Sequence, residues 1–117
     1  MRRDFQRLSD IVEAAAKIAE YVTSRTATDF INDQFFQDAV LRQLTIVGEA
    51  ASKLSADFRA DHDAIPWKAI IGFRQRIVHE YFGLNLDTAW RITTVALPEL
   101  AAQITEILAA EIPCDFH

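Results

Sequence analysis

Apolar residues recur along this chain at three- and four-residue intervals, the spacing that places side chains on one face of an α-helix. The first stripe falls within residues 4–23, and charged residues such as Asp10 and Glu13 lie off it. Its members are Leu8, Ile11, Val12, Ala15, Ile18, Ala19 and Val22. The pattern predicts an amphipathic helix with one buried face. The short polar segment 23–29 predicts a turn, which would make the next helix an antiparallel neighbour.

A second apolar stripe predicts one long helix, capped at its start by Thr28 or Asp29. Its members are Phe36, Ala39, Val40, Leu44, Val47, Ala51, Leu54 and Phe58. Gly48 lies inside this helix, where glycine costs about 1 kcal/mol relative to alanine. We therefore expect Gly48 to permit a close crossing with another helix.

Two further helices are predicted after a polar break at residues 61–63. Pro66 suits the first turn of the third helix, which should stop near Gly83 in a left-handed C-cap. Asn85 or Asp87 should cap the last helix, and Pro98 should kink it because proline lacks a backbone donor. No strand-period alternation appears. The chain is therefore predicted to be all-α, an up-down four-helix bundle with a short third helix.

Composition narrows the class of protein. A length of 117 residues favours a single domain, 1–117, and the net charge of −5 argues against a broad basic surface for nucleic acid. It leaves room for a local cationic cleft. The lone Cys114 cannot form an internal disulfide, which fits a cytoplasmic location. No apolar run approaches the length of a membrane span and no signal peptide is evident, so no membrane association is expected.

The segment 72–83 carries the candidate chemistry, because it places Arg74, His79 and Tyr81 within a few turns of the third helix. Arginine offers a planar donor fork that suits phosphate, and histidine exchanges protons near neutral pH. This pair is a minimal set for cleaving a phosphodiester without a metal. The spacing alone is weak evidence, since a surface arginine and a histidine at a helix C-terminus produce it as well.

Helix geometry adds a condition. On an ideal helix His79 lies about 140° around and about 7.5 Å along from Arg74, whereas Tyr81 returns to within about 20° of Arg74. Arg74 and His79 therefore do not share a face. A cleft or a subunit interface across the end of this helix would gather all three residues. Arg76 and Lys68 add local positive charge in an acidic protein.

Two other groups of polar residues bear on the site. Glu49 on the second helix is either a partner for a motif cation such as Arg74 or a solvated carboxylate, and the sequence leaves both open. The sequence Asp61-His62-Asp63 lacks convergent ligands and reads as a polar turn. We therefore expect no metal site and no cofactor.

The residues around the motif resemble the signature of the HepT-like branch of the HEPN superfamily (domain of unknown function group 86). One segment is 65–83, in which a Pro-Trp pair precedes the Arg-x4-His-x-Tyr motif; the other is 46–54, which contains Gly-Glu-Ala. The resemblance covers almost the whole chain. The chain departs from the family at Gln75, because the family usually has a small polar residue, most often Asn, directly after the motif arginine.

The resemblance implies a four- to five-helix bundle that forms a homodimer, with the motif residues of both subunits facing a cleft. It also implies a metal-independent RNase that acts as the toxin of a two-gene toxin–antitoxin module. The antitoxin would be a minimal nucleotidyltransferase of the MntA type, which transfers AMP to the motif tyrosine, here Tyr81. The surplus of aromatic residues also suggests a dimer, because some of them should be exposed. They are Phe35, Phe36, Phe73 and Phe82.

Two classes of function remain. In the first, Arg74 holds the scissile phosphate of RNA while His79 moves a proton, with Gln75, Arg76 and Glu49 in support. In the second, the chain is a non-catalytic interaction or nucleotide-binding module that docks on a nucleotidyltransferase. The acidic net charge and Gln75 favour the second class, whereas the intact Arg, His and Tyr favour the first.

Overall fold

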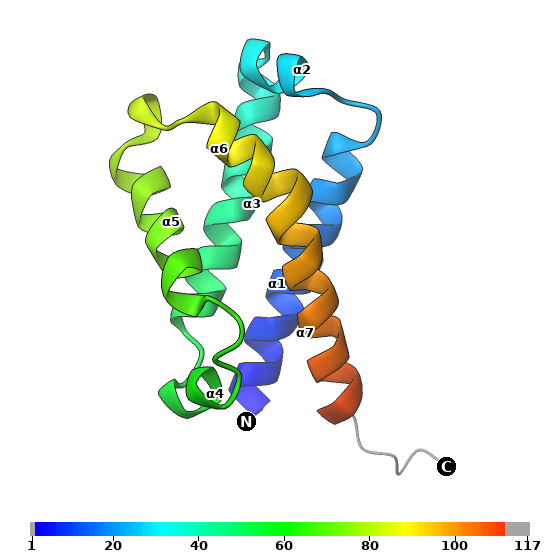
Figure 1. Cartoon of the computed structure of the whole chain (residues 1–117), viewed down its shortest axis with the longest axis vertical. Helices are drawn as coiled ribbons and strands as arrows, with labels where there is room; N and C mark the ends of the chain where they lie inside the picture. Colours follow the sequence, from blue (N-terminus) through cyan, green and yellow to red (C-terminus); the bar gives the residue numbers. More distant parts are fainter. Residues whose placement is uncertain (1, 112–117) are drawn as a thin grey trace.

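The structure, a computed structural model, describes residues 2–111, apart from the side chains of Arg2, Phe82 and Glu111. Cys114 lies outside this range. Every regular element within the range is helical, which confirms the all-α class (Figure 1). In chain order the elements are α1 (Arg2–Val22), α2 (Ala27–Asn32), α3 (Gln34–Ser52), α4 (Ala56–Asp61), α5 (Trp67–His79), the 3-10 helix η1 (Tyr81–Gly83), α6 (Leu86–Arg91), the π-helix η2 (Ile92–Ala96) and α7 (Leu97–Glu111).

The long helices alternate in direction along the longest axis of the molecule (Figure 1). α1 runs up, α3 down, α5 up, and the continuous run α6–η2–α7 down. α3 packs against both α1 and α5, and α7 packs against α1. Leu8, Ile11 and Ile18 of α1 are fully or almost fully buried in the core between them. The predicted up-down order is therefore confirmed, although the helices are shorter and more numerous than expected.

The second predicted helix is divided into three, because the side chains of Asp33 and Ser55 each cap a new helix within it. Thr26, rather than Thr28 or Asp29, caps α2, and Asp29 completes its capping box. Asp33 follows α2 and caps α3 by accepting from the Phe36 N–H. Ser55 caps α4 in the same way. Such caps satisfy backbone donors at a helix start, so a long helix can be interrupted while the apolar residues keep their spacing.

The end of α5 also differs from the prediction. The helix stops at His79, four residues before Gly83, and the chain continues through the 3-10 turn η1. No glycine among the described residues has a positive φ angle, so the predicted left-handed cap at Gly83 is wrong. The Glu80 N–H closes the last turn on the Arg76 carbonyl oxygen at 2.8 Å. This early stop matters for the site, since it takes Tyr81 off the helix.

The last predicted helix begins where expected. Asn85 caps α6 by accepting from the Thr88 N–H at 3.0 Å. The π-helical segment η2 ends at Ala96, two residues before Pro98, whose missing donor and crowding of a carbonyl disturb regular α-helical bonding in the preceding turn.

The helical run Leu86–Ala110 is long and apolar enough to cross a membrane, by length and composition only. A candidate span was not expected from the sequence, because no uninterrupted apolar run in it approaches that length. Core helices of soluble proteins meet the same criterion, and this run places Leu97, Leu100 and Ile104 in the core, with α7 packed against α1. We therefore interpret it as a core helix.

Candidate active site

The site is built around the crossing of α3 and α5. A Cβ atom placed on Gly48 of α3 would overlap the Cβ atom of Arg74 and lie 2.8 Å from its Cγ atom. Only a residue without a side chain allows the two helices to approach this closely. The predicted close crossing at Gly48 is therefore confirmed, and its partner is the candidate phosphate-binding arginine.

The guanidinium of Arg74 is held by the residue next to Gly48. Its Nη2 donates to Oε2 of Glu49 at 2.8 Å, and the two side chains are 26% and 43% exposed. Lys53 lies 3.4 Å from the other carboxylate oxygen of Glu49. The Nε of Arg74 is buried without a hydrogen-bond partner among the described residues. Of the two alternatives for Glu49, the structure shows the ion pair, at a site where solvent still reaches.

Tyr81 reaches α3 at a different point. It lies in η1 and is partly buried, and its hydroxyl donates to Oδ1 of Asp38. Gln34 donates to the same carboxylate oxygen at 2.9 Å. Tyr81 was expected to continue the helical stripe of Arg74, and that expectation is wrong because α5 ends at His79. The contact with Asp38, not helix periodicity, brings Tyr81 to the α3 side.

Arg74 and Tyr81 therefore meet the same stripe of α3. Asp38, Arg42 and Glu49 are separated by four and seven residues, which on a helix places all three within about 40° of each other. Arg42 is exposed between the two contacts. Sequence reasoning missed Asp38. The available signal was its position eleven residues, about three turns, before Glu49.

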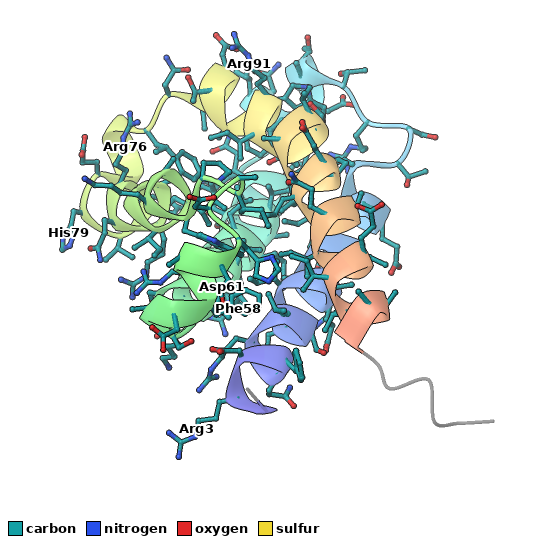
Figure 2. The ribbon with its side chains drawn as sticks, turned by 60° about the horizontal axis from the view of Figure 1, so that its bottom comes forward. Arg3, Phe58, Asp61, Arg76, His79 and Arg91 are labelled. Atoms are coloured by element: carbon teal, nitrogen blue, oxygen red, sulfur yellow. The ribbon has the colours of Figure 1, made fainter. Side chains whose placement is uncertain are left out.

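His79 lies on the other side of α5. It is the last residue of the helix and is exposed, and Figure 2 shows His79 and Arg76 at the outer edge of α5. Gln75 is exposed one turn before His79, about 40° from it around the helix. The structure thus pairs Arg74 with Glu49 and places Tyr81 on the same stripe of α3, about 16.5 Å further along the helix. It leaves His79, Gln75 and Arg76 on the outer surface of the same chain.

The polar turn before α5 has a structural role. The His62 ring lies against the Phe58 ring, with centroids 4.5 Å apart, and the His62 carbonyl oxygen accepts from the Trp67 Nε1–H at 3.0 Å. Within residues 2–111 no three side chains of the metal-binding types come together. Trp67 is buried, and the Trp90 ring lies 5.4 Å from that of Phe30, so both tryptophans pack against the core.

Comparison with protein families assigns residues 11–107, most of the chain, to one described as ribonuclease HepT-like. The chain belongs to this family. The matched range includes both contacts with α3 and the whole Arg-x4-His-x-Tyr motif. The resemblance carried by that motif is thereby confirmed.

Curated relatives support membership of the HepT-like family. The protein named "Putative RNase TTE0752" from Caldanaerobacter subterraneus is 38% identical over 104 residues, covering 89% of this chain and 93% of the relative. The "Probable ribonuclease HepT" of Thermococcus cleftensis is 33% identical, covering 86% and 91%.

A third relative is longer. "Gamma-glutamylcyclotransferase and putative RNase MJ0434" from Methanocaldococcus jannaschii is 36% identical to this chain over 109 residues. The match covers 92% of this chain but only 49% of the relative, so this chain spans about half of that protein's length. Comparison with solved structures found no significant match.

Proposed function

We propose that this chain is a metal-independent endoribonuclease and the toxin of a two-gene module in the cytoplasm, neutralised by a nucleotidyltransferase antitoxin. The observation that carries the proposal is the position of Arg74 within a chain of the HepT-like ribonuclease family. Its guanidinium is fixed at the base by the crossing at Gly48 and at the tip by Glu49, yet it remains partly exposed. A fixed, accessible guanidinium suits the phosphate of an RNA backbone.

The proposed reaction uses the neighbouring 2′-hydroxyl of the RNA as nucleophile. A neutral histidine takes the hydroxyl proton, the 2′-oxygen forms a bond to phosphorus, and the bond from phosphorus to the 5′-oxygen breaks. A protonated histidine gives a proton to the departing 5′-oxygen. Arg74 holds the phosphate and stabilises the charge that builds on its oxygens. His79 is the proposed proton-transfer residue.

A homodimer would overcome the separation between Arg74 and His79. Within one chain these residues lie on different sides of α5, so a second copy across this region would bring His79 of one chain near Arg74 of the other. Two exposed apolar side chains support such a face: Phe35 is 88% exposed and Val78 is 49% exposed. Of the aromatic residues expected at an interface, Phe35 fits, Phe36 is buried and Phe73 is partly buried; the Phe82 side chain is outside the description.

Inactivation is proposed to occur at Tyr81. Transfer of AMP from the antitoxin would attach a bulky, negatively charged group to the hydroxyl that now contacts Asp38. That group would lie on the α3 stripe shared with Arg42 and Arg74. It would compete with RNA for these cations and repel the RNA backbone, by the charge effect that phosphorylation also uses.

The test is cleavage of a fluorescently labelled single-stranded RNA by purified protein in the presence of a chelator. We expect the wild-type chain to cleave, and Arg74→Ala and His79→Ala each to lose at least about 100-fold in rate. Arg91→Ala is the matched control, because Arg91 is an exposed cation on α6, distant from His79 (Figure 2). Its rate should stay at the wild-type level.

The alternative, a non-catalytic module that docks on a nucleotidyltransferase, predicts another outcome. The wild-type protein would then leave RNA intact and arrest no growth when expressed without its partner, yet would bind that partner. Equal cleavage by the wild type and His79→Ala would also remove the proposed role of His79.

A further inference from the structure

We infer that Arg59 and Lys68 form a second phosphate-binding subsite, which holds the RNA backbone at a distance from the bond to be cleaved. This inference rests on the proposed RNase function. It concerns a surface of α4 and α5 outside the contacts between Arg74, Glu49, Tyr81 and Asp38.

The subsite is an open pocket where α4 meets the beginning of α5. Its volume of about 500 Å³ is ample for a phosphate group. The lining residues are Ala56, Arg59, Ala60, Trp67, Lys68 and Ile71. Trp67 is buried, whereas Lys68 is exposed. The pocket is therefore an apolar depression with two cations at its wall.

The charges in this pocket favour an anion. No carboxylate lines it, although the chain as a whole has a net charge of −5. Neither Arg59 nor Lys68 forms an ion pair with any residue in the described part of the chain. The Nε of Arg59 is buried and has no hydrogen-bond partner there either. A bound anion would meet the outer nitrogens of this guanidinium, which are accessible, and a phosphate oxygen is a strong acceptor for them.

The pocket lies on the same side of α5 as His79. Lys68 and His79 are eleven residues apart, which on a regular helix gives a separation of about 16.5 Å along the axis and only about 20° around it. Gly72 and Gln75 lie between them on this side. A Cβ atom on Gly72 would meet nothing within 4 Å, so the surface between the pocket and His79 is open. A few nucleotides of single strand can follow this path.

The experiment measures binding of a fluorescein-labelled single-stranded RNA by anisotropy across a range of KCl concentrations. All proteins carry His79→Ala, so that no cleavage occurs during the titration. We expect Lys68→Gln and Arg59→Gln each to weaken binding several-fold and to reduce the slope of log affinity against log salt by about 0.7. Arg91→Gln, which removes an exposed cation from α6, should change neither the affinity nor the salt slope.

A second measurement uses the cleaving protein. Lys68→Gln should raise KM and leave kcat unchanged, because the contact is remote from the reacting phosphate. Because Lys68 is exposed, its variant should remain folded, and circular dichroism checks this. The inference is overturned if Lys68→Gln affects RNA binding no more than Arg91→Gln does. Failure of the wild type to cleave, with these binding differences intact, would instead remove the proposed RNase function and leave the subsite.

Discussion

Gly48 of α3 and Arg74 of α5 are in direct contact, with the backbone of the glycine packed against the first carbons of the arginine side chain. The next residue of α3, Glu49, holds the far end of the same side chain. Two consecutive residues thus fix both ends of one arginine. The glycine lowers helix propensity, and the gain is a helix crossing close enough to limit the directions in which the guanidinium can point.

The first prediction concerns this crossing. Gly48→Ala should destabilise the protein by about 1–3 kcal/mol, because the new methyl group meets the beginning of the Arg74 side chain, which cannot move away without shifting α5. Gly72→Ala is the matched control on α5, where nothing lies within 4 Å. It should stabilise the helix by up to about 1 kcal/mol. Urea unfolding measures both, and equal stabilisation by the two changes would contradict the tight crossing.

The second prediction concerns the ion pair between Arg74 and Glu49. Both side chains are partly exposed, so solvent screens their attraction. A double-mutant cycle of Arg74→Ala and Glu49→Gln should give a coupling free energy of folding below about 1 kcal/mol. RNA cleavage should respond more strongly than stability, because Glu49 sets the direction of the guanidinium. Lys53→Ala, which removes the other partner of Glu49, is the comparison variant in both the stability and the cleavage measurements.

A coupling free energy of several kcal/mol would mean that the pair is a structural bond of the bundle. A Glu49→Gln protein that cleaves RNA as fast as the wild type would mean that Glu49 does not position Arg74.

The helical class and the order of the helices could be predicted from sequence, because apolar stripes of period 3.6 report directly which face is buried. The breaks at Asp33 and Ser55 could not. The predicted second helix includes both positions, and only the caps they form show that the backbone leaves the helix there. Local capping competes with helix continuation on nearly equal terms, and tertiary contacts decide the result. One such contact joins Ser55 to Asp4, at 2.8 Å from hydroxyl to carboxylate.

Prediction of the candidate site from sequence is limited in the same way, by contacts between distant parts of the chain. Arg74, His79 and Tyr81 could be selected from residue type and spacing, and Glu49 could be proposed as a partner. The angle between Arg74 and His79 follows from helix geometry, which the regular helix from Trp67 to His79 preserves. The position of Tyr81 could not be predicted, since it depends on where the helix stops and on a contact with Asp38, forty-three residues away.

The third prediction concerns stability in acid. The Phe36 N–H, together with Arg25, holds the pKa of the Asp33 carboxyl below its ordinary value. The folded protein therefore binds this proton less readily than the unfolded chain. The stabilisation is fully present above the unfolded pKa of about 3.9 and is lost as the pH falls below it towards the lowered value. Asp33→Asn keeps a cap acceptor without the charge, so its urea midpoint should fall less between pH 5 and pH 3 than that of the wild type.

Asp57→Asn is the comparison for this prediction, because Asp57 is an exposed carboxylate on α4 with no hydrogen bond or ion pair from its side chain in the described structure. It should keep the acid dependence of the wild type. An Asp33→Asn protein that loses stability in acid as steeply as the wild type would show that another group governs the transition.

The last prediction concerns Tyr81 as the acceptor of AMP. Incubation with the nucleotidyltransferase and ATP should add the mass of AMP to the wild type and not to Tyr81→Phe, as intact-protein mass spectrometry can show. Tyr21→Phe, which changes the other tyrosine of the chain, should be modified as the wild type is. Asp38→Asn should slow the modification about tenfold, because the carboxylate that now accepts from the Tyr81 hydroxyl holds it in position and can draw off its proton. Modification of Asp38→Asn at the wild-type rate would show that the antitoxin alone positions this hydroxyl.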